Sequence, residues 1–127
     1  MIWATKYRRQ IFTEPELVND LKNILLRISF VSGVEIEEME VMPDHVHLLI
    51  SFKPKHAPTD IVKKFKGASA RMFFAQHPEI KKHKLWGGKL WSNSYFMSTL
   101  GNMSRDTERK NIQNQYVKKE EPNSTHG

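Results

Sequence analysis

Apolar residues recur at steps of three and four in two long segments of the chain, the spacing of helices that bury one face. The first segment has a capping-box pattern at Thr13 and Glu16 and ends at Gly33, a residue type that often terminates helices. The second begins with Thr59 as a cap and ends just before Pro78. The expected buried positions are Leu17, Leu21, Ile24, Ile28 and Val31 in the first helix and Ile61, Val62, Phe65, Met72 and Phe73 in the second.

Other segments are typical of strands. Residues 34–42 alternate and then slip phase near Glu37, which predicts a bulged strand. Residues 1–7 resemble the end of an edge strand whose earlier part is missing, and residues 85–91 resemble two apolar arms around a Gly-Gly hairpin turn, with strand continuing over 95–100. Residues 45–52 form a further strand, whose alternation puts His45, His47, Leu49 and Ser51 on one face and Val46, Leu48, Ile50 and Phe52 on the other.

The last predicted element is a helix from about Ser104 to Lys118, in a segment rich in Arg, Glu, Lys and Gln. Met103, Ile112 and Val117 are too few apolar residues to hold it to its own domain. We therefore expect it to dock through polar contacts, at a site or on a partner. Residues 1–119 are expected to form a single domain, and residues 120–127 a disordered tail.

The composition narrows the possible partners. Lys and Arg number 20 against 14 Asp and Glu, so the formal net charge is +6. This surplus favours a polyanion such as nucleic acid, although basic proteins without such a partner are also common. The absence of cysteine excludes disulfides and thiolate metal sites, and it fits a reducing, cytoplasmic location. Neither a signal-peptide pattern nor an apolar run of about 20 residues is present, so no membrane partner is expected.

Two histidines carry the candidate chemistry. His45 and His47 project from the same face of their strand, with Cα atoms about 6.5–7 Å apart, so both imidazoles can converge on one ion. Glu40 and Asp44 lie just upstream, where they could ligate directly or orient the imidazoles. Nitrogen and oxygen ligands suit Mg²⁺ or Mn²⁺, which can polarise a scissile phosphate. The pattern indicates nucleic-acid strand cleavage; the alternative is a polar strand end with histidines of no special role.

Several separated motifs, in order along nearly the whole chain, resemble one family: the single-tyrosine HUH transposases of IS200-like insertion sequences, which move as single-stranded DNA. The motifs are WATKYR at 3–8, EVMPDHVHLL at 40–49, KGASAR at 66–71, LWGGKLW at 85–91, SYF at 94–96 and IQNQ at 112–115.

This resemblance implies an α+β fold, with a ferredoxin-like or RRM-like antiparallel sheet, helices on one face, and a homodimer that can exchange its C-terminal helix. It implies that His45, His47 and Gln115 bind a divalent metal, Mg²⁺ or Mn²⁺, and that the partner is single-stranded DNA with hairpins at the element ends. The positions that we assign to DNA phosphates, from charge more than from motif, are Lys6, Arg8, Arg9, Lys63, Lys64, Lys66 and Arg71.

The chain departs from the family pattern at the nucleophile. The family's tyrosine stands four residues before the metal-binding glutamine, where this chain has Asn111. A carboxamide cannot form the covalent link to phosphorus, so we expect the covalent step to be disabled. Tyr116 is the nearest substitute in sequence but lies about 100° round the helix from Gln115. Glu108 also stands where the family tends to be apolar.

Three functions follow as hypotheses. The first is a metal-dependent DNA strand transferase by ancestry whose covalent step is disabled. The second is a regulator or domesticated relative that binds hairpin DNA without cutting it. The third, an unrelated ferredoxin-like RNA binder, ranks last because no aromatic pair typical of an RNA recognition motif is evident on a central strand.

Overall fold

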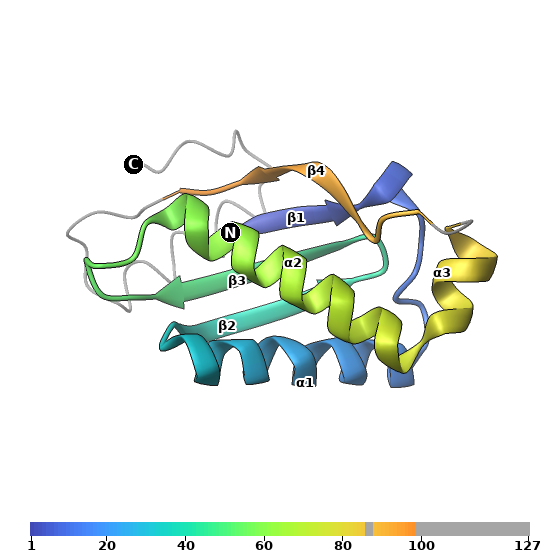
Figure 1. Cartoon of the computed structure of the whole chain (residues 1–127), viewed down its shortest axis with the longest axis horizontal. Coiled ribbons are helices and arrows are strands. Elements are labelled where there is room, and N and C mark those ends of the chain that lie inside the picture. The colour runs from blue at the N-terminus through green and yellow to red at the C-terminus, as the bar shows by residue number, and fades with distance from the viewer. Residues whose placement is uncertain (86–87, 99–127) are drawn as a thin grey trace. The chain divides into compact units, whose positions relative to one another are not determined.

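The chain forms one antiparallel sheet and a layer of helices (Figure 1). The structure is a computed structural model that describes residues 1–85 and 88–98. Its elements are β1 (Ile2–Thr5), the short 3-10 helix η1 (Lys6–Arg8), α1 (Pro15–Ser32), β2 (Glu35–Met42), β3 (His45–Ser51), α2 (Pro58–Gln76), α3 (Pro78–Lys84) and β4 (Trp91–Phe96). All strand pairs are antiparallel, which confirms the expected α+β class.

The first strand is central in the sheet. The strand order is β2-β3-β1-β4, so β1 pairs on both sides, and Trp3 is 1% exposed. The prediction of a residual edge strand is therefore wrong. The strand also ends at Thr5, not at Tyr7, because the backbone of Tyr7 and Arg8 turns to φ values of 58° and 54°, which cannot continue a strand.

The hairpin of β2 and β3 is built as the alternation predicts. Its register shifts between Ile36 and Glu38, which confirms the bulge. Val46 and Leu48 are fully buried, whereas His45 and His47 are half-buried on the opposite face. The helices α1 and α2 lie on one side of the sheet (Figure 1), and they contact β2 and β4. Because Val46 and Leu48 are fully buried, they belong to the face that these helices cover, and the histidines belong to the other face.

The helices begin at prolines and not at the expected threonine caps. The residue before Pro15, Glu14, has an extended backbone and makes no side-chain cap, because a following proline disfavours the helical conformation. The helix α2 begins in the same way at Pro58. Thr13 therefore lies outside α1 and Thr59 lies inside α2, and both capping predictions are wrong.

The core stripe of α1 is mostly as expected. Leu17, Leu21, Ile24 and Ile28 are buried. Val31 is 75% exposed because the last turn of α1 borders an open groove beside α2, so the prediction that it is buried is wrong. Leu25, which was not among the predicted core residues, is fully buried. Gly33 ends the helix with φ of 77°, as predicted. In α2, Ile61, Val62, Phe65 and Phe73 are buried and Met72 is half-buried.

The connection from α2 to β4 differs from the expected hairpin. The helix α3 follows α2 at once, and Leu85 and Leu90 are buried as anchors of the segment that leads to β4. The strand β4 begins at Trp91, earlier than expected, and pairs with β1. Leu85 directly follows α3 and Leu90 directly precedes β4, so neither leucine lies in a strand; the predicted turn includes residues 86–87, which lie outside the described residues.

Some predictions fall outside the described residues: the helix at 104–118, the domain boundary at 119 and the tail at 120–127. Asn111 and Gln115 also lie there. In the part of the chain that the structure describes, no helix has the length and apolar character needed to cross a membrane.

Candidate metal and nucleic-acid site

The two predicted histidines lie two positions apart on β3, and each has a partner residue on both neighbouring strands. His45 pairs with Ala4 of β1 and Met42 of β2, and His47 pairs with Ile2 and Glu40. Because partners across an antiparallel pair share a face, all these side chains belong to the face away from α1 and α2. The alternation in the sequence thus placed both imidazoles on one surface correctly.

Asp44 orients His45. A carboxylate oxygen of Asp44 lies 2.9 Å from Nδ1 of His45. With Nδ1 donating to Asp44, the lone pair of Nε2 is available to a metal, the arrangement that metal-binding histidines usually have. The Arg8 Nε donates to the other Asp44 oxygen at 3.0 Å. The hydrogen bond from His45, with help from Arg8, holds the pKa of the Asp44 carboxyl below its usual range, although burial raises it.

His47 is held in its neutral form. Burial lowers the pKa of His47 to about 4, and the charges of the chain's amino terminus and of His45 act in the same direction. A neutral imidazole is the form that binds metals, because its nitrogen keeps a lone pair. At neutral pH, His47 can therefore act as a ligand without first losing a proton.

The described residues supply two imidazoles and no complete ligand set. Within 1–85 and 88–98, His, Asp and Glu side chains nowhere gather in groups of three that could hold a metal ion. Glu40 is exposed on the strand next to His47, and Asp44 is engaged by His45 and Arg8. The geometry gives Asp44 an orienting position behind His45, so the described residues place two nitrogen donors together and no third donor beside them. Two half-buried nitrogen donors on one face of the sheet are compatible with a divalent ion.

The 3-10 turn η1, beside this site, was not foreseen from the sequence. Tyr7 and Arg8 both have positive φ, which costs about 1–3 kcal/mol for each non-glycine residue. The turn is tied to the β2–β3 connection, because the Thr5 amide donates to the Asp44 carbonyl at 2.9 Å and the Ile11 amide to the Pro43 carbonyl at 2.9 Å. Of the assigned DNA contacts, Lys6, Arg8 and Arg9 belong to this region.

The basic residues of α2 belong to the other side of the sheet. Lys63, Lys64 and Arg71 line an open groove of about 440 Å³ between α1 and α2, together with Arg27 of α1. Sequence reasoning missed Arg27, because its position beside α2 depends on the packing of the two helices. The structure therefore divides the expected phosphate contacts between two surfaces, one near the histidines and one on the helical layer.

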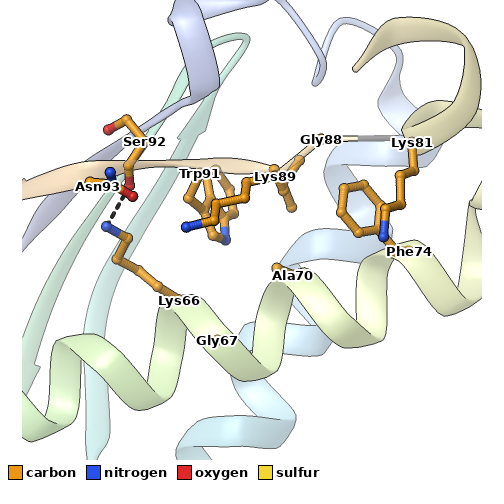
Figure 2. Close-up of a pocket in the computed structure, with 11 residues that line it drawn as sticks. Lys66, Gly67, Ala70, Phe74, Lys81, Gly88, Lys89, Trp91, Ser92 and Asn93 are labelled. Atoms are coloured by element: carbon orange, nitrogen blue, oxygen red, sulfur yellow. Dashed lines mark hydrogen bonds between the residues drawn. The ribbon is translucent and has the colours of Figure 1, made fainter. Parts of the chain in front are cut away.

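Lys66 occupies a third position, in a groove of about 470 Å³ lined by α2, α3 and β4 (Figure 2). Its Nζ donates to the carbonyl oxygens of Ser92 at 2.7 Å and Ser94 at 3.2 Å. Burial lowers the pKa of Lys66, and the charge of Lys89 adds to this effect. The ammonium of Lys66 thus holds β4 against α2, which leaves it less available to a phosphate than its sequence position suggested.

The fold and the histidine pair define an α+β protein with two imidazoles on the face of an antiparallel sheet that α1 and α2 leave free. The model of the family described as "Transposase IS200 like" matches residues 1–115. The chain belongs to this family of IS200-like transposases.

Individual relatives agree with this assignment. The ISDra2 transposase TnpA of Deinococcus radiodurans is 47% identical over 118 residues, which cover 93% of this chain and 83% of the relative. The transposase for insertion sequence element IS200 of Salmonella typhimurium is 31% identical over 101 residues, which cover 80% of this chain and 65% of the relative. A crystal structure of a protein from D. radiodurans R1, described as a transposase, superposes with a TM-score of 0.72 at 45% identity, covering 90% of this chain and 86% of that one.

Proposed function

We propose that this protein binds hairpin-bearing single-stranded DNA and holds a divalent ion, Mg²⁺ or Mn²⁺, between His45, His47 and the amide oxygen of Gln115. The observation that carries the proposal is the pair of neighbouring imidazoles on the sheet face away from α1 and α2, one oriented by Asp44 and the other kept neutral by burial. Membership of a transposase family makes DNA the expected polyanion.

Such an ion would polarise the scissile phosphate and orient its leaving oxygen. The residues of this chain prepare the place for it. Asp44 holds the ring of His45 through Nδ1 and leaves Nε2 for the ion, and the hydrogen bonds of His45 and Arg8 lower the pKa of the Asp44 carboxyl. The three donors named are nitrogen and oxygen atoms, which are compatible with Mg²⁺ and Mn²⁺.

The covalent step is proposed to be disabled. A family member would attack phosphorus with a tyrosine at the position of Asn111, and a carboxamide lacks the hydroxyl that would form the phosphotyrosine bond. The protein would therefore bind and orient its DNA without becoming joined to it. We also propose a homodimer, because the segment 104–118 has too few apolar residues to dock on its own domain.

The alternative is a protein that occupies hairpin DNA and needs no metal. It is favoured by Asn111 and by the position of Lys63, Lys64 and Arg71 on the helical layer, away from the histidines. Under this alternative, the double variant His45→Ala/His47→Ala keeps its DNA affinity, and binding weakens steeply with salt.

The test combines metal binding with adduct formation. Titration with Mn²⁺ should show one site per chain that is lost in His45→Ala and in His47→Ala. With Mn²⁺ and a hairpin oligonucleotide, the natural chain should give no covalent adduct on a denaturing gel, and Asn111→Tyr should give one. An adduct from the natural chain would refute the disabled step, and undiminished Mn²⁺ binding by the histidine variants would refute the metal site.

A further inference from the structure

The turn η1 presents an aromatic ring next to the histidine site. Tyr7 is 76% exposed. The Lys6 Nζ lies 5.1 Å from the ring centroid, a cation–π distance. An exposed aromatic ring contributes little to the core, so the ring of Tyr7 is available to stack against a ligand.

The turn is held in an unfavourable backbone conformation by its surroundings. Tyr7 and Arg8 adopt φ values of 58° and 54°, which bulky side chains rarely do. The hydroxyl of Thr5 donates to the Arg9 carbonyl at 2.7 Å and spans the turn, and the Lys6 amide donates to the Leu90 carbonyl at 2.9 Å. Strain of this kind persists where the position of a side chain matters to function.

A chain of contacts connects the turn to the histidines. The Arg8 guanidinium, whose side chain is 64% exposed, binds one oxygen of Asp44, and the other oxygen of Asp44 binds Nδ1 of His45. Most of the Arg8 side chain therefore stays open to solvent beside this ion pair. A nucleotide that lies against η1 would therefore also lie beside the proposed metal site.

We propose that Tyr7 is a stacking platform for one unpaired base of the strand that crosses His45 and His47, with Arg8 and Lys6 binding the phosphates next to that base. The inference rests on the proposed function, since it takes single-stranded DNA as the ligand of this face. Every base has a flat π face, so stacking holds the strand without selecting its sequence, while the cations provide salt-dependent affinity.

The experiment measures how tightly the protein binds a hairpin oligonucleotide that has an unpaired flank. The measurement is repeated with a series of oligonucleotides, each with an abasic site at a different position of the flank. Tyr7→Gly should weaken binding about tenfold, the size of one lost base stack. The matched variant Tyr7→Phe, which keeps the ring, should bind within about twofold of the natural chain. At one flank position, the abasic site should weaken DNA binding by the natural chain about tenfold. The same abasic site should not weaken DNA binding by Tyr7→Gly any further.

A second readout separates binding from folding. Glycine tolerates the positive φ at this position, so Tyr7→Gly should not lower the melting temperature. The platform would be overturned if Tyr7→Gly bound DNA as tightly as the natural chain, or if Tyr7→Phe lost as much affinity as Tyr7→Gly. It would also be overturned if each abasic site weakened DNA binding by Tyr7→Gly as much as it weakens binding by the natural chain. If the natural chain binds no hairpin DNA, the proposed function fails with it; if the natural chain binds DNA and Mn²⁺ normally and Tyr7→Gly does the same, the platform alone fails.

Discussion

A carboxylate oxygen of Asp44 lies 2.9 Å from Nδ1 of the adjacent residue His45, and the second oxygen of Asp44 receives the Arg8 guanidinium at 3.0 Å. Neighbouring residues in a chain can pair in this way here because Asp44 belongs to the turn before β3 and His45 is the first residue of that strand. The carboxylate therefore fixes both the tautomer and the direction of the His45 ring without occupying Nε2.

Replacing Asp44 by asparagine should weaken Mn²⁺ binding about 10–100-fold, the usual effect of losing an orienting partner behind a metal-bound histidine. Isothermal titration with Mn²⁺ measures it. The matched control is Glu40→Gln on β2, opposite His47, which should leave the affinity nearly unchanged. If Glu40→Gln weakened binding as much as Asp44→Asn, Glu40 would be a direct ligand and Asp44 would have no special place.

Two glycines should respond to alanine with opposite signs. Gly33 ends α1 with φ of 77°, and an added Cβ meets nothing within 4 Å, so Gly33→Ala should destabilise the fold by about 1–2 kcal/mol through backbone conformation alone. Gly67 lies inside α2, again with open space around a Cβ, so Gly67→Ala should stabilise by about 0.5–1 kcal/mol. Urea unfolding of both variants measures the difference, and two shifts of the same sign would contradict the argument.

Alternation with a period of two was enough to place His45 and His47 on one face and Val46 and Leu48 on the other, because this period follows from strand geometry alone. Apart from the two helix starts, which neighbouring prolines set, the failures arise where a position depends on contacts between distant segments. The exposure of Val31 reflects where α1 ends relative to α2, and the place of β1 between β3 and β4 follows from pairing that no local pattern encodes.

The candidate site was also predictable where local spacing defines it and not where distant segments meet. The histidines were found from their spacing, and Asp44 from its place beside them. The turn at Tyr7 and Arg8 was missed, because positive φ at non-glycine residues has no marker in the sequence and is imposed by tertiary contacts. The bond between Arg8 and Asp44 spans 36 positions and appears only when the chain is folded.

The lysines of α2 should separate into DNA-binding and structural residues. Lys64 is exposed at the groove between α1 and α2, so Lys64→Met should leave stability within about 0.5 kcal/mol and reduce the salt dependence of DNA binding by about one phosphate contact. Lys66→Met removes donors from the Ser92 and Ser94 carbonyls, so it should cost about 1–3 kcal/mol of stability and change the salt slope little.

Unfolding in urea and a series of DNA titrations at increasing salt measure these two effects on the same variants. The reverse outcome, with Lys66 carrying a phosphate contact and Lys64 carrying stability, would show that the ammonium of Lys66 leaves β4 when DNA binds.

His77 connects α1 to the junction between α2 and α3. Its Nε2 lies 2.6 Å from an Asp20 carboxylate oxygen, and its Nδ1 lies 3.1 Å from a Glu79 oxygen. Burial lowers the pKa of His77, but the hydrogen bonds and charges of Asp20 and Glu79 outweigh it, so the pKa is raised above its ordinary value of 6.5. A raised pKa in the folded state means that protonation stabilises the fold. This contribution is complete below pH 6.5 and is lost as the pH rises through the folded-state pKa.

The variant His77→Asn should therefore lose more stability below pH 6.5 than well above it, and the difference between the natural chain and the variant should shrink steadily as the pH rises through the folded-state pKa of His77. Urea unfolding at a series of pH values measures the difference in stability between the two proteins. Groups that titrate in the same way in both proteins do not contribute to this difference. A difference that stayed constant with pH would mean that His77 contributes through packing and not through its charge, since a neutral ring in the same place makes the same van der Waals contacts at every pH.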